Sequence, residues 1–428
     1  MRPEVEAVSG ASTRRILIAS LVGTTIEFYD FYIYATAASL VFGQLFFPAE
    51  SKSAQILFAF ASISLAFFAR PLGAIAFGHF GDRIGRKSTL VASLLLMGGS
   101  TALIAILPTY ETAGALAPLL LCILRFGQGF GLGGEWGGAA LLAVENAPPG
   151  WRGRFGMVPQ LGAPLGFICA NGLFLLIGLA LTPEQFTAWG WRLPFATSIA
   201  LVFLGLWIRL KLHETPAFKA AMAHEAPPKV PLATLFRDHL GPTLAGTLGV
   251  VACFALFYIA TAFALSFGTN ELGYSRTAFL QIQLGAILFM ALGIVISGWW
   301  SDMASPRLVL IAGSAATIGV GALIGPVFGA GAAGAFAFLA LALLVMGFVY
   351  GPLGAWLPGL FPAHVRYTGA SLAFNVGGII GGGGAPIAAK ALADAGGLGL
   401  VGLYLGGAGL LSLVGLFASR SARDDLTA

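Results

Sequence analysis

The sequence predicts an all-α integral membrane protein whose twelve transmembrane helices form two pseudo-symmetric bundles of six. Hydrophobic residues make up 57% of the chain and charged residues only 10%, whereas an average soluble domain is about 25% charged. Apolar runs of membrane length, about 20 residues each, follow one another along the sequence. We expect helices because an open strand edge cannot satisfy its hydrogen bonds in lipid, and a barrel requires strict alternation of apolar and polar residues. The twelve runs are residues 16–44, 54–78, 88–108, 115–143, 154–181, 191–211, 241–268, 277–300, 308–329, 333–360, 367–392 and 398–419.

A polar segment divides these spans into six and six. Residues 213–239 contain four prolines and several charged side chains, which is typical of a loop and not of a membrane span. We therefore predict an N-terminal bundle at 1–211, a cytoplasmic linker at 212–240 and a C-terminal bundle at 241–428. The halves also resemble one another, because the loops after the second and eighth spans share a glycine, an aspartate and a basic residue. Duplicated halves around a midplane site are typical of secondary transporters.

The distribution of lysine and arginine predicts which loops lie in the cytoplasm. Seventeen of the 23 basic residues fall at the termini or in the alternate loops that share their side, and only four fall on the other side. Loops rich in Lys and Arg remain on the cytoplasmic side of a membrane. We therefore expect a multi-pass membrane protein with both termini in the cytoplasm.

Charged residues inside the apolar runs are the first candidates for a functional site. Insertion of a charged side chain at the bilayer centre costs about 2.5–3.5 kcal/mol. Glu27 lies about 16 Å into the first span at a rise of 1.5 Å per residue, and Asp30 and Tyr34 follow on the same helix face. We expect Glu27 and Asp30 to couple transport to protons. The alternative is that these charges only pair with one another and fix the helices together.

The second and fourth spans supply the complementary bases. Arg125, Gln128 and Glu135 fall within about 80° of one another on the fourth span, and Arg70 interrupts the second. Together with the two acids they predict a carboxylate–guanidinium centre in the N-terminal half. Arg125, Gln128, Tyr34, Arg70 and Glu135 are therefore candidate substrate contacts. Glu135 and Arg70 lie nearer the cytoplasmic side, where a structural or gating role is an equal alternative.

The C-terminal half carries no charge near mid-depth, so its candidates are neutral. Six side chains could provide hydrogen bonds or an aromatic wall to a substrate, namely Tyr258, Thr261, Gln281, Tyr350, Trp356 and Asn375. The alternative is that they are core residues or anchors at the membrane interface. Lys390, near the end of the eleventh span, is expected to extend to the outer surface.

The charged loop between the second and third spans predicts a gate. Its sequence is GHFGDRIGRK at residues 78–87. We expect Asp82 to accept hydrogen bonds from backbone N–H groups at the start of the eleventh span, where the helix dipole favours an acid. The alternative is that the basic residues only enforce the topology. The residues assigned to the gate are Gly78, Asp82, Arg83, Gly85 and Arg86, with Asp302 and Arg366 in the second half.

Several of these segments resemble the metabolite:proton symporter family of the major facilitator superfamily. The pattern G-x-x-x-D-R-x-G-R-K at 78–87 is similar to the superfamily's loop signature. GTTIEFYDF at 23–31, FARPLG at 68–73, and RFGQG and GGEW within 125–136 are similar to the family's own motifs. Members import shikimate, α-ketoglutarate, citrate, or proline and betaine together with protons. The first span is most similar to the shikimate-transporter-like branch.

The resemblance implies a bacterial inner-membrane symporter of a small polar metabolite, with an organic carboxylate as the expected substrate. A drug–proton antiporter and a proline/betaine symporter remain alternatives. A membrane receptor or a membrane enzyme is a further alternative class, but no His cluster, Ser/His pair or metal-ligand spacing in the sequence supports catalysis. We expect no cofactor, no metal and no nucleic-acid partner. The expected partners are the substrate, protons and the lipid bilayer, with the protein a monomer.

Overall fold

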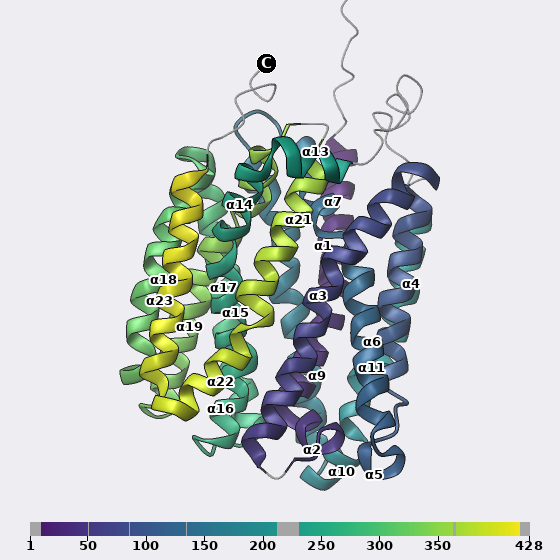
Figure 1. Cartoon of the computed structure of the whole chain (residues 1–428), viewed down its shortest axis with the longest axis vertical. Coiled ribbons are helices and arrows are strands. Elements are labelled where there is room, and N and C mark those ends of the chain that lie inside the picture. Colours follow the sequence, from purple (N-terminus) through teal and green to yellow (C-terminus); the bar gives the residue numbers. More distant parts are fainter. Residues whose placement is uncertain are drawn as a thin grey trace, which may run out of the picture.

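The computed structural model describes residues 10–49, 51–84, 86–133, 135–211, 231–362 and 365–419. These residues are almost entirely helical, and the long helices run roughly parallel (Figure 1). Below, upper and lower refer to the orientation of Figure 1, in which α1 begins and α23 ends at the upper end.

Six crossings come from the first half of the chain. The first is α1 (Gly10–Ala37), which continues through the π-helix η1 (Ala38–Phe42) into α2 (Gly43–Phe46). The others are α3 (Lys52–Ile84), α4 (Arg86–Ile104), α6 (Leu116–Leu132) with α7 (Glu135–Glu145), α8 (Arg152–Gln160) with α9 (Gly162–Ala180), and α11 (Leu193–Lys211). Short helices α5 (Tyr110–Ala113), α10 (Pro183–Ala188) and η2 (Gly190–Arg192) join them at the lower end.

The second half supplies six more crossings. Its first crossing is α14 (Leu240–Gly249), α15 (Val251–Tyr258), the π-helix η3 (Ile259–Phe263) and α16 (Ala264–Asn270) in succession. It is followed by α17 (Arg276–Met303), α18 (Pro306–Phe328), α19 (Gly331–Tyr350) with α20 (Leu353–Trp356) and η4 (Pro358–Leu360), α21 (Arg366–Gly378) with η5 (Ile379–Gly383) and α22 (Ala385–Gly396), and α23 (Leu398–Ala418).

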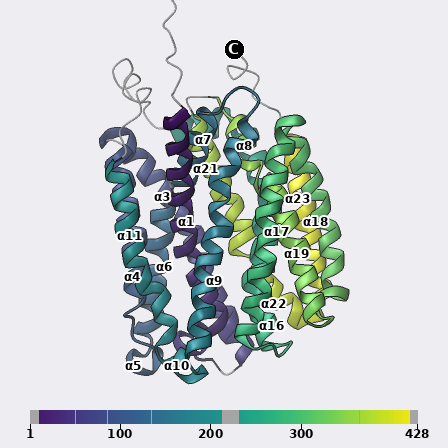
Figure 2. The ribbon, with the colours of Figure 1, turned by 180° about the vertical axis from the view of Figure 1, so that it is seen from behind.

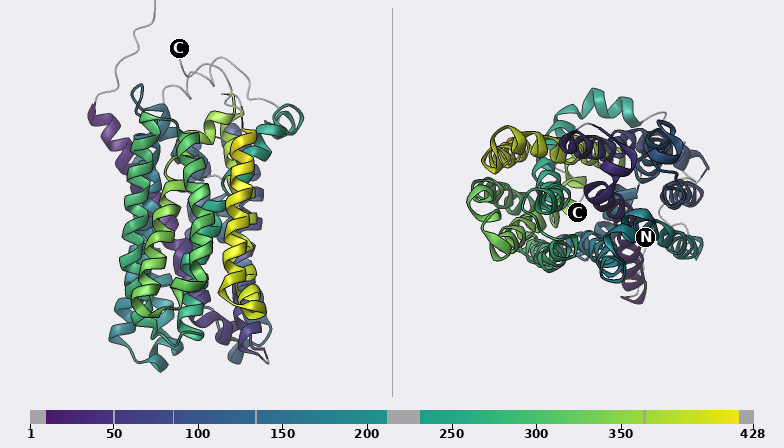
Figure 3. Two further views of the ribbon diagram at one scale, coloured as in Figure 1. Left: turned by 90° about the vertical axis from the view of Figure 1, so that its left-hand side faces the viewer. Right: turned by 90° about the horizontal axis from the view of Figure 1, so that it is seen from below.

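Ten helical segments of the described chain are long and apolar enough to cross a membrane. The helices α1 and α4 run alongside those ten (Figure 2). The fold is therefore the expected all-helical membrane protein with twelve spans. Helices of the first half lie on one side and helices of the second half on the other, as the view along the bundle shows (Figure 3).

Two local expectations are refined. The charged segment at 78–87 is helical on both sides of residue 85, because α3 extends to Ile84 and α4 begins at Arg86. The predicted loop is thus mostly two helix ends.

The predicted linker contains a short helix. Within it, α13 (Pro231–Asp238) covers the upper end of α14 and α21, with Leu235 buried and Phe236 exposed.

Glycines allow the same close packing in both halves. A Cβ added at Gly129 of α6 would lie 2.3 Å from the carbonyl oxygen of Ala66 in α3. In the second half, a Cβ added at Gly293 of α17 would lie 2.3 Å from the carbonyl oxygen of Leu344 in α19. Backbone contact at these points requires the absence of a side chain, as in other membrane helices. The α3–α6 contact places two arginine-bearing helices side by side.

Aromatic side chains fill the boundary between the halves. Phe31 of α1 lies edge-on to Tyr258 of α15, with ring centroids 6.2 Å apart. Phe67 of α3 contacts the same tyrosine at 5.3 Å. Nearer the upper end, Trp136 of α7 stacks on Phe374 of α21 at 3.7 Å. The centre of the molecule is therefore an aromatic layer shared by both halves.

Candidate functional site

Arg125 lies at the centre of the first half with its side chain fully buried. Its guanidinium carbon sits 4.0 Å from the ring centroid of Tyr34 and 4.3 Å from that of Phe31. Nη1 donates to Oε1 of Gln128 at 3.1 Å, whereas Nε and Nη2 have no hydrogen-bond partner. A buried cation with free donors is costly unless an anion or water pairs with it. Arg125 is therefore poised to bind an anion.

Arg70 approaches the same aromatic group from α3. Its guanidinium carbon is 4.5 Å from the ring of Phe31 and 4.9 Å from that of Phe67. The side chain is buried, and its Nε has no hydrogen-bond partner. Two guanidinium groups thus share the ring of Phe31, and Tyr258 of the second half interacts electrostatically with both. The pair forms a positively charged site at the boundary between the halves.

Asp30 is buried behind this site, on the side of α1 that faces α11 and α4. Its Oδ1 accepts a hydrogen bond from the hydroxyl of Ser198, and its Oδ2 has no partner. The carboxylate also interacts with Thr101, and Thr101 accepts a hydrogen bond of 2.7 Å from Nε2 of Gln128. Because Gln128 also accepts from Arg125, hydrogen bonds join Arg125, Gln128 and Thr101. The hydroxyl of Thr101 donates to the carbonyl oxygen of Met97 at 2.9 Å and not to Asp30.

Glu27 occupies a different environment from Asp30. It is half-buried and interacts electrostatically with Arg70 and with Tyr350 of α19. The two acids of α1 therefore have different neighbours, which the expectation of one shared centre did not distinguish. Tyr34 lies between the helices, where its hydroxyl donates to Ser62 at 2.8 Å while its ring contacts Arg125.

Glu135 begins α7 above this site. It is buried, and it accepts a hydrogen bond from the hydroxyl of Ser93 in α4. Its charge also acts on Asp30. Glu135 therefore joins α7 to α4 on the same side of the bundle as the aspartate.

The candidates in the second half are placed unevenly. Tyr258 lies in the central aromatic layer, and Trp356 is buried against Gly249. Nδ2 of Asn375 in α21 donates a hydrogen bond of 3.1 Å to the carbonyl oxygen of Gly133, at the end of α6. Gln281 was expected to face the site, but its side chain is exposed on α17. Its expected position is wrong because the helix is rotated so that residue 281 points outward.

At the upper end, Asp302 of α17 contacts the first turn of α8. Its carboxylate accepts from the backbone nitrogens of Gly153 at 2.6 Å and Arg154 at 3.1 Å. It also forms an ion pair of 3.3 Å with Nε of Arg154. An acid from the second half thus caps a helix N-terminus in the first, where the helix dipole stabilises negative charge.

The other gate candidates are only partly described. Arg366 begins α21 and donates from Nε to the carbonyl oxygen of Phe361 at 3.1 Å. Gly78, Asp82, Arg83 and Arg86 lie in helical backbone, but their side-chain placement is outside the described part of the chain. Gly85 lies outside the described residues altogether.

The lower end holds a charged cluster that the sequence did not predict. Lys390 of α22 is buried, not extended to the surface as expected, and it pairs with Asp394 one turn later and with Glu271 at 3.4 Å. Asp394 in turn accepts a hydrogen bond from Ser53 at the start of α3. The two halves therefore contact each other at both ends of the molecule. Only the apolar context of Lys390 hinted at burial.

Twelve membrane helices in two halves, with a buried cationic site between them, define a transporter of the major facilitator class. The profile of the sugar (and other) transporter family matches residues 16–234, and the chain belongs to that family. In this class the site binds a small molecule for transport and does not catalyse a reaction. The protein is therefore a membrane transporter and not an enzyme.

Characterised and solved relatives agree with this class. The inner membrane metabolite transport protein YhjE of Escherichia coli K12 is 49% identical over 395 residues, covering 91% of this chain and 90% of the relative. The shikimate transporter of the same organism is 38% identical over 400 residues, covering 91% of this chain and 90% of that transporter. A crystal structure of a D-xylose–proton symporter superposes with a TM-score of 0.71 at 18% identity, covering 94% of this chain and 96% of that one. At that identity the structural likeness concerns the fold alone.

Proposed function

We propose that this protein is a proton-coupled symporter that imports a small organic carboxylate across the bacterial inner membrane. The observation that carries the proposal is the pair of buried arginines at the boundary between the halves, each with unpaired guanidinium donors. An anion is the ligand that such a pair favours, and a carboxylate matches the two-pronged geometry of a guanidinium. The relative named as a shikimate transporter supports the same class of substrate.

The substrate carboxylate binds Arg125, with Arg70 and Tyr258 at the same boundary. The proton is carried by Asp30 or Glu27, because these acids lie in the same span as the aromatic ring that both arginines contact. Neutralising an acid near the arginines changes how strongly the positive charge of the arginines attracts the substrate anion. Proton binding and substrate binding therefore influence each other, which is the requirement for symport. Gln128 and Thr101, which are hydrogen-bonded to each other, lie near both Arg125 and Asp30.

Transport proceeds by alternating access of two halves, residues 1–211 and 241–428, joined by the cytoplasmic segment 212–240. In this scheme the upper end faces the cytoplasm, because most basic residues outside the spans belong to that side. Asp302 acts as a gate there, since its contact with α8 must break when the halves separate at that end. Asp82 has the same role toward the start of α21. The protein works as a monomer.

Uptake by purified protein in proteoliposomes tests the function. Labelled hydroxycarboxylates, dicarboxylates, proline and betaine are supplied with and without an inward proton gradient. We expect accumulation of one or more carboxylates only when the gradient is imposed. Gradient-driven uptake of proline or betaine alone would establish the compatible-solute alternative, which a relative named as a proline/betaine transporter, 30% identical over 391 residues, keeps open. Expulsion of cationic drugs instead would contradict the carboxylate assignment.

A further inference from the structure

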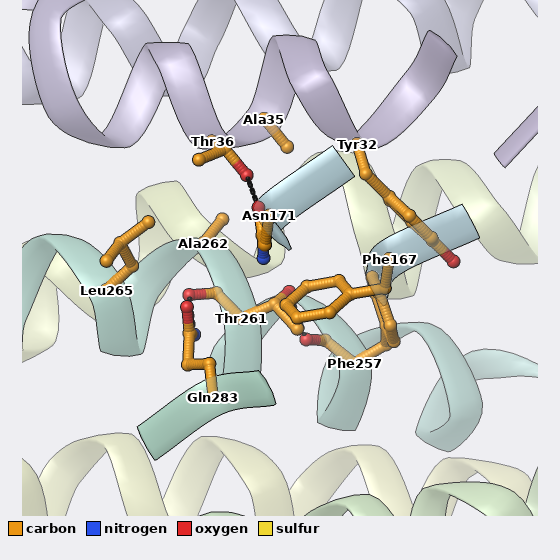
Figure 4. A pocket seen from close by; sticks show the side chains of 10 residues that line it. All are labelled: Tyr32, Ala35, Thr36, Phe167, Asn171, Phe257, Thr261, Ala262, Leu265 and Gln283. Carbon is orange, nitrogen blue, oxygen red and sulfur yellow. Dashed lines mark hydrogen bonds between the residues drawn. The ribbon is translucent and has the colours of Figure 1, made fainter. Parts of the chain in front are cut away.

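A small polar cavity lies between the halves, away from the arginines. Its volume is about 10 Å³, which is enough for one water-sized group. Four polar side chains line it: Thr36 of α1, Asn171 of α9, Thr261 of η3 and Gln283 of α17 (Figure 4). The aromatic side chains of Tyr32, Phe167 and Phe257 also line it. Of these four polar residues, Thr261 was among the candidates expected from the sequence, and Thr36, Asn171 and Gln283 were not.

Asn171 presents a hydrogen-bond donor to this cavity. Its side chain is only 1% exposed. Oδ1 accepts a hydrogen bond of 2.6 Å from the hydroxyl of Thr36, which fixes the orientation of the amide. Nδ2 points away from Thr36 and has no partner (Figure 4). A buried amide donor without a partner is unfavourable, so the site is complete only when an acceptor occupies it.

Gln283 presents an acceptor from the opposite half. It is also 1% exposed. Its Nε2 donates to the carbonyl oxygens of Ala260 at 3.2 Å and Thr261 at 2.9 Å. Both carbonyls belong to the π-helix η3, and π-helical turns are frequent at functional sites. With Nε2 held in this way, Oε1 is left without a partner.

We propose that Asn171 and Gln283 form a subsite for a hydroxyl group of the transported molecule. A hydroxyl can accept from Asn171 and donate to Gln283 at the same time, whereas a carboxylate has no proton for Gln283 and an ammonium has no acceptor for Asn171. The two amides come from different halves, so a bound hydroxyl bridges them. This inference rests on the proposed function and narrows its substrate class to hydroxylated carboxylates.

The cavity and the arginines lie at neighbouring levels of α1. Thr36, which lines the cavity, follows Phe31, the ring that both arginines contact, by five residues. This corresponds to about 8 Å along the helix and about 140° around it. Tyr32, which lines the cavity, also interacts with Arg70. The two sites are therefore neighbouring parts of one binding region.

Binding of matched ligand pairs to the purified full-length protein tests the subsite. The probes are cyclohexanecarboxylate against cis- and trans-4-hydroxycyclohexanecarboxylate, and butanedioate against hydroxybutanedioate, measured by calorimetry in detergent. We expect the wild-type protein to bind at least one hydroxylated member about two- to tenfold more tightly than its partner. Gln283→Met should abolish that preference while changing the affinity for the unhydroxylated member less than about twofold.

A second change tests the other half of the subsite independently. Thr36→Val with Asn171→Leu replaces both members of the hydrogen-bonded pair by apolar groups and should also abolish the preference. Thr36→Val alone keeps Nδ2 of Asn171 and should retain it. Gln281→Met, on the exposed face of α17 two residues away, is the matched control and should behave as wild type.

Two results would overturn the subsite while leaving the proposed function intact. One is gradient-driven carboxylate uptake by a wild-type protein that shows no hydroxyl preference, in which case the cavity holds only a structural water. The other is a preference that survives both Gln283→Met and the double variant. If no carboxylate of either kind binds or is transported, the proposed function fails and the subsite with it.

Discussion

The two halves of this transporter share their packing and differ in their chemistry. Gly129 brings α6 against α3 in the first half, and Gly293 brings α17 against α19 in the second, with equal closeness. Yet Asp30, Arg70 and Arg125 are buried in the first half. Among the described residues of the second half, the buried charged side chains include Asp302 at the upper end and Lys390 near the lower end, each 6% exposed. The duplicated fold thus supplies two similar scaffolds, and only one carries charge at mid-depth.

This difference has a physical consequence for transport. Moving a buried charge relative to its partners is costly in a medium of low dielectric constant. If the charged chemistry is confined to the first half, the second half can move against it with neutral hydrogen bonds and aromatic contacts. Its contributions near the site, Tyr258, Gln283 and Asn375, are neutral groups of this kind.

The largest effect is expected from neutralising Asp30, the buried acid of the charged half. A pH gradient of one unit supports at most about tenfold accumulation for one coupled proton. Asp30→Asn should reduce accumulation in proteoliposomes to equality of inside and outside concentrations, because the amide cannot take up the proton. Substrate exchange without a gradient should persist. Glu27→Gln, measured in parallel, shows which acid carries the proton, and full accumulation by both single variants and the double variant would contradict the assignment.

Removing the two-pronged base should have the next largest effect. Arg125→Lys keeps the charge but loses the planar fork, and a hydrogen bond to a charged group contributes about 1.5–3 kcal/mol. The apparent KM for the carboxylate should rise about tenfold to hundredfold. Arg192→Lys is the control, because the guanidinium of Arg192 lies at the lower end, where it donates to the carbonyl oxygens of Ala105 and Leu107 and packs on the ring of Trp191. An unchanged KM in Arg125→Lys would exclude direct contact with the substrate.

A third change tests whether the upper ends of the two halves are equivalent. Asp302→Asn removes a charge that interacts with a helix N-terminus, an effect of about 1 kcal/mol, which alters a conformational equilibrium about fivefold. Uptake should slow by a few-fold while the substrate Kd in detergent changes less than about twofold. Asp82→Asn should behave alike if the halves are functionally symmetric. The exposed Asp238 provides the control Asp238→Asn, and wild-type rates in Asp302→Asn would reject the gate.

The smallest effect is expected at the lower end of the second half. Lys390→Met leaves Asp394 and Glu271 unpaired, but their side chains are 40% and 48% exposed and remain hydrated. Ion pairs of this exposure contribute at most about 1 kcal/mol. The thermal unfolding midpoint should fall by about 2 °C, with uptake nearly unchanged, as should also hold for the exposed control Lys52→Met. Loss of transport would instead mark the cluster as part of the mechanism.

Local composition is enough to predict the class of protein, the number of spans and the charged residues that need a function. The last span was expected at 398–419, and α23 covers Leu398–Ala418. The buried charges Asp30, Arg70 and Arg125 were also identified in advance. These features depend on local composition, because a run of apolar residues of sufficient length enters the membrane whatever its neighbours are, and a charge within it stands out.

The direction in which each side chain points, and what it contacts, depend on how the helices pack together. Gln281 and Gln283 are equivalent by composition, yet two residues rotate a helix by about 200°, so one is exposed and the other lines a cavity. Likewise Asp30 accepts from Ser198, a residue 168 positions away in the chain. Depth in the membrane is a property of the segment, whereas rotation about the helix axis depends on packing against helices that are distant in sequence.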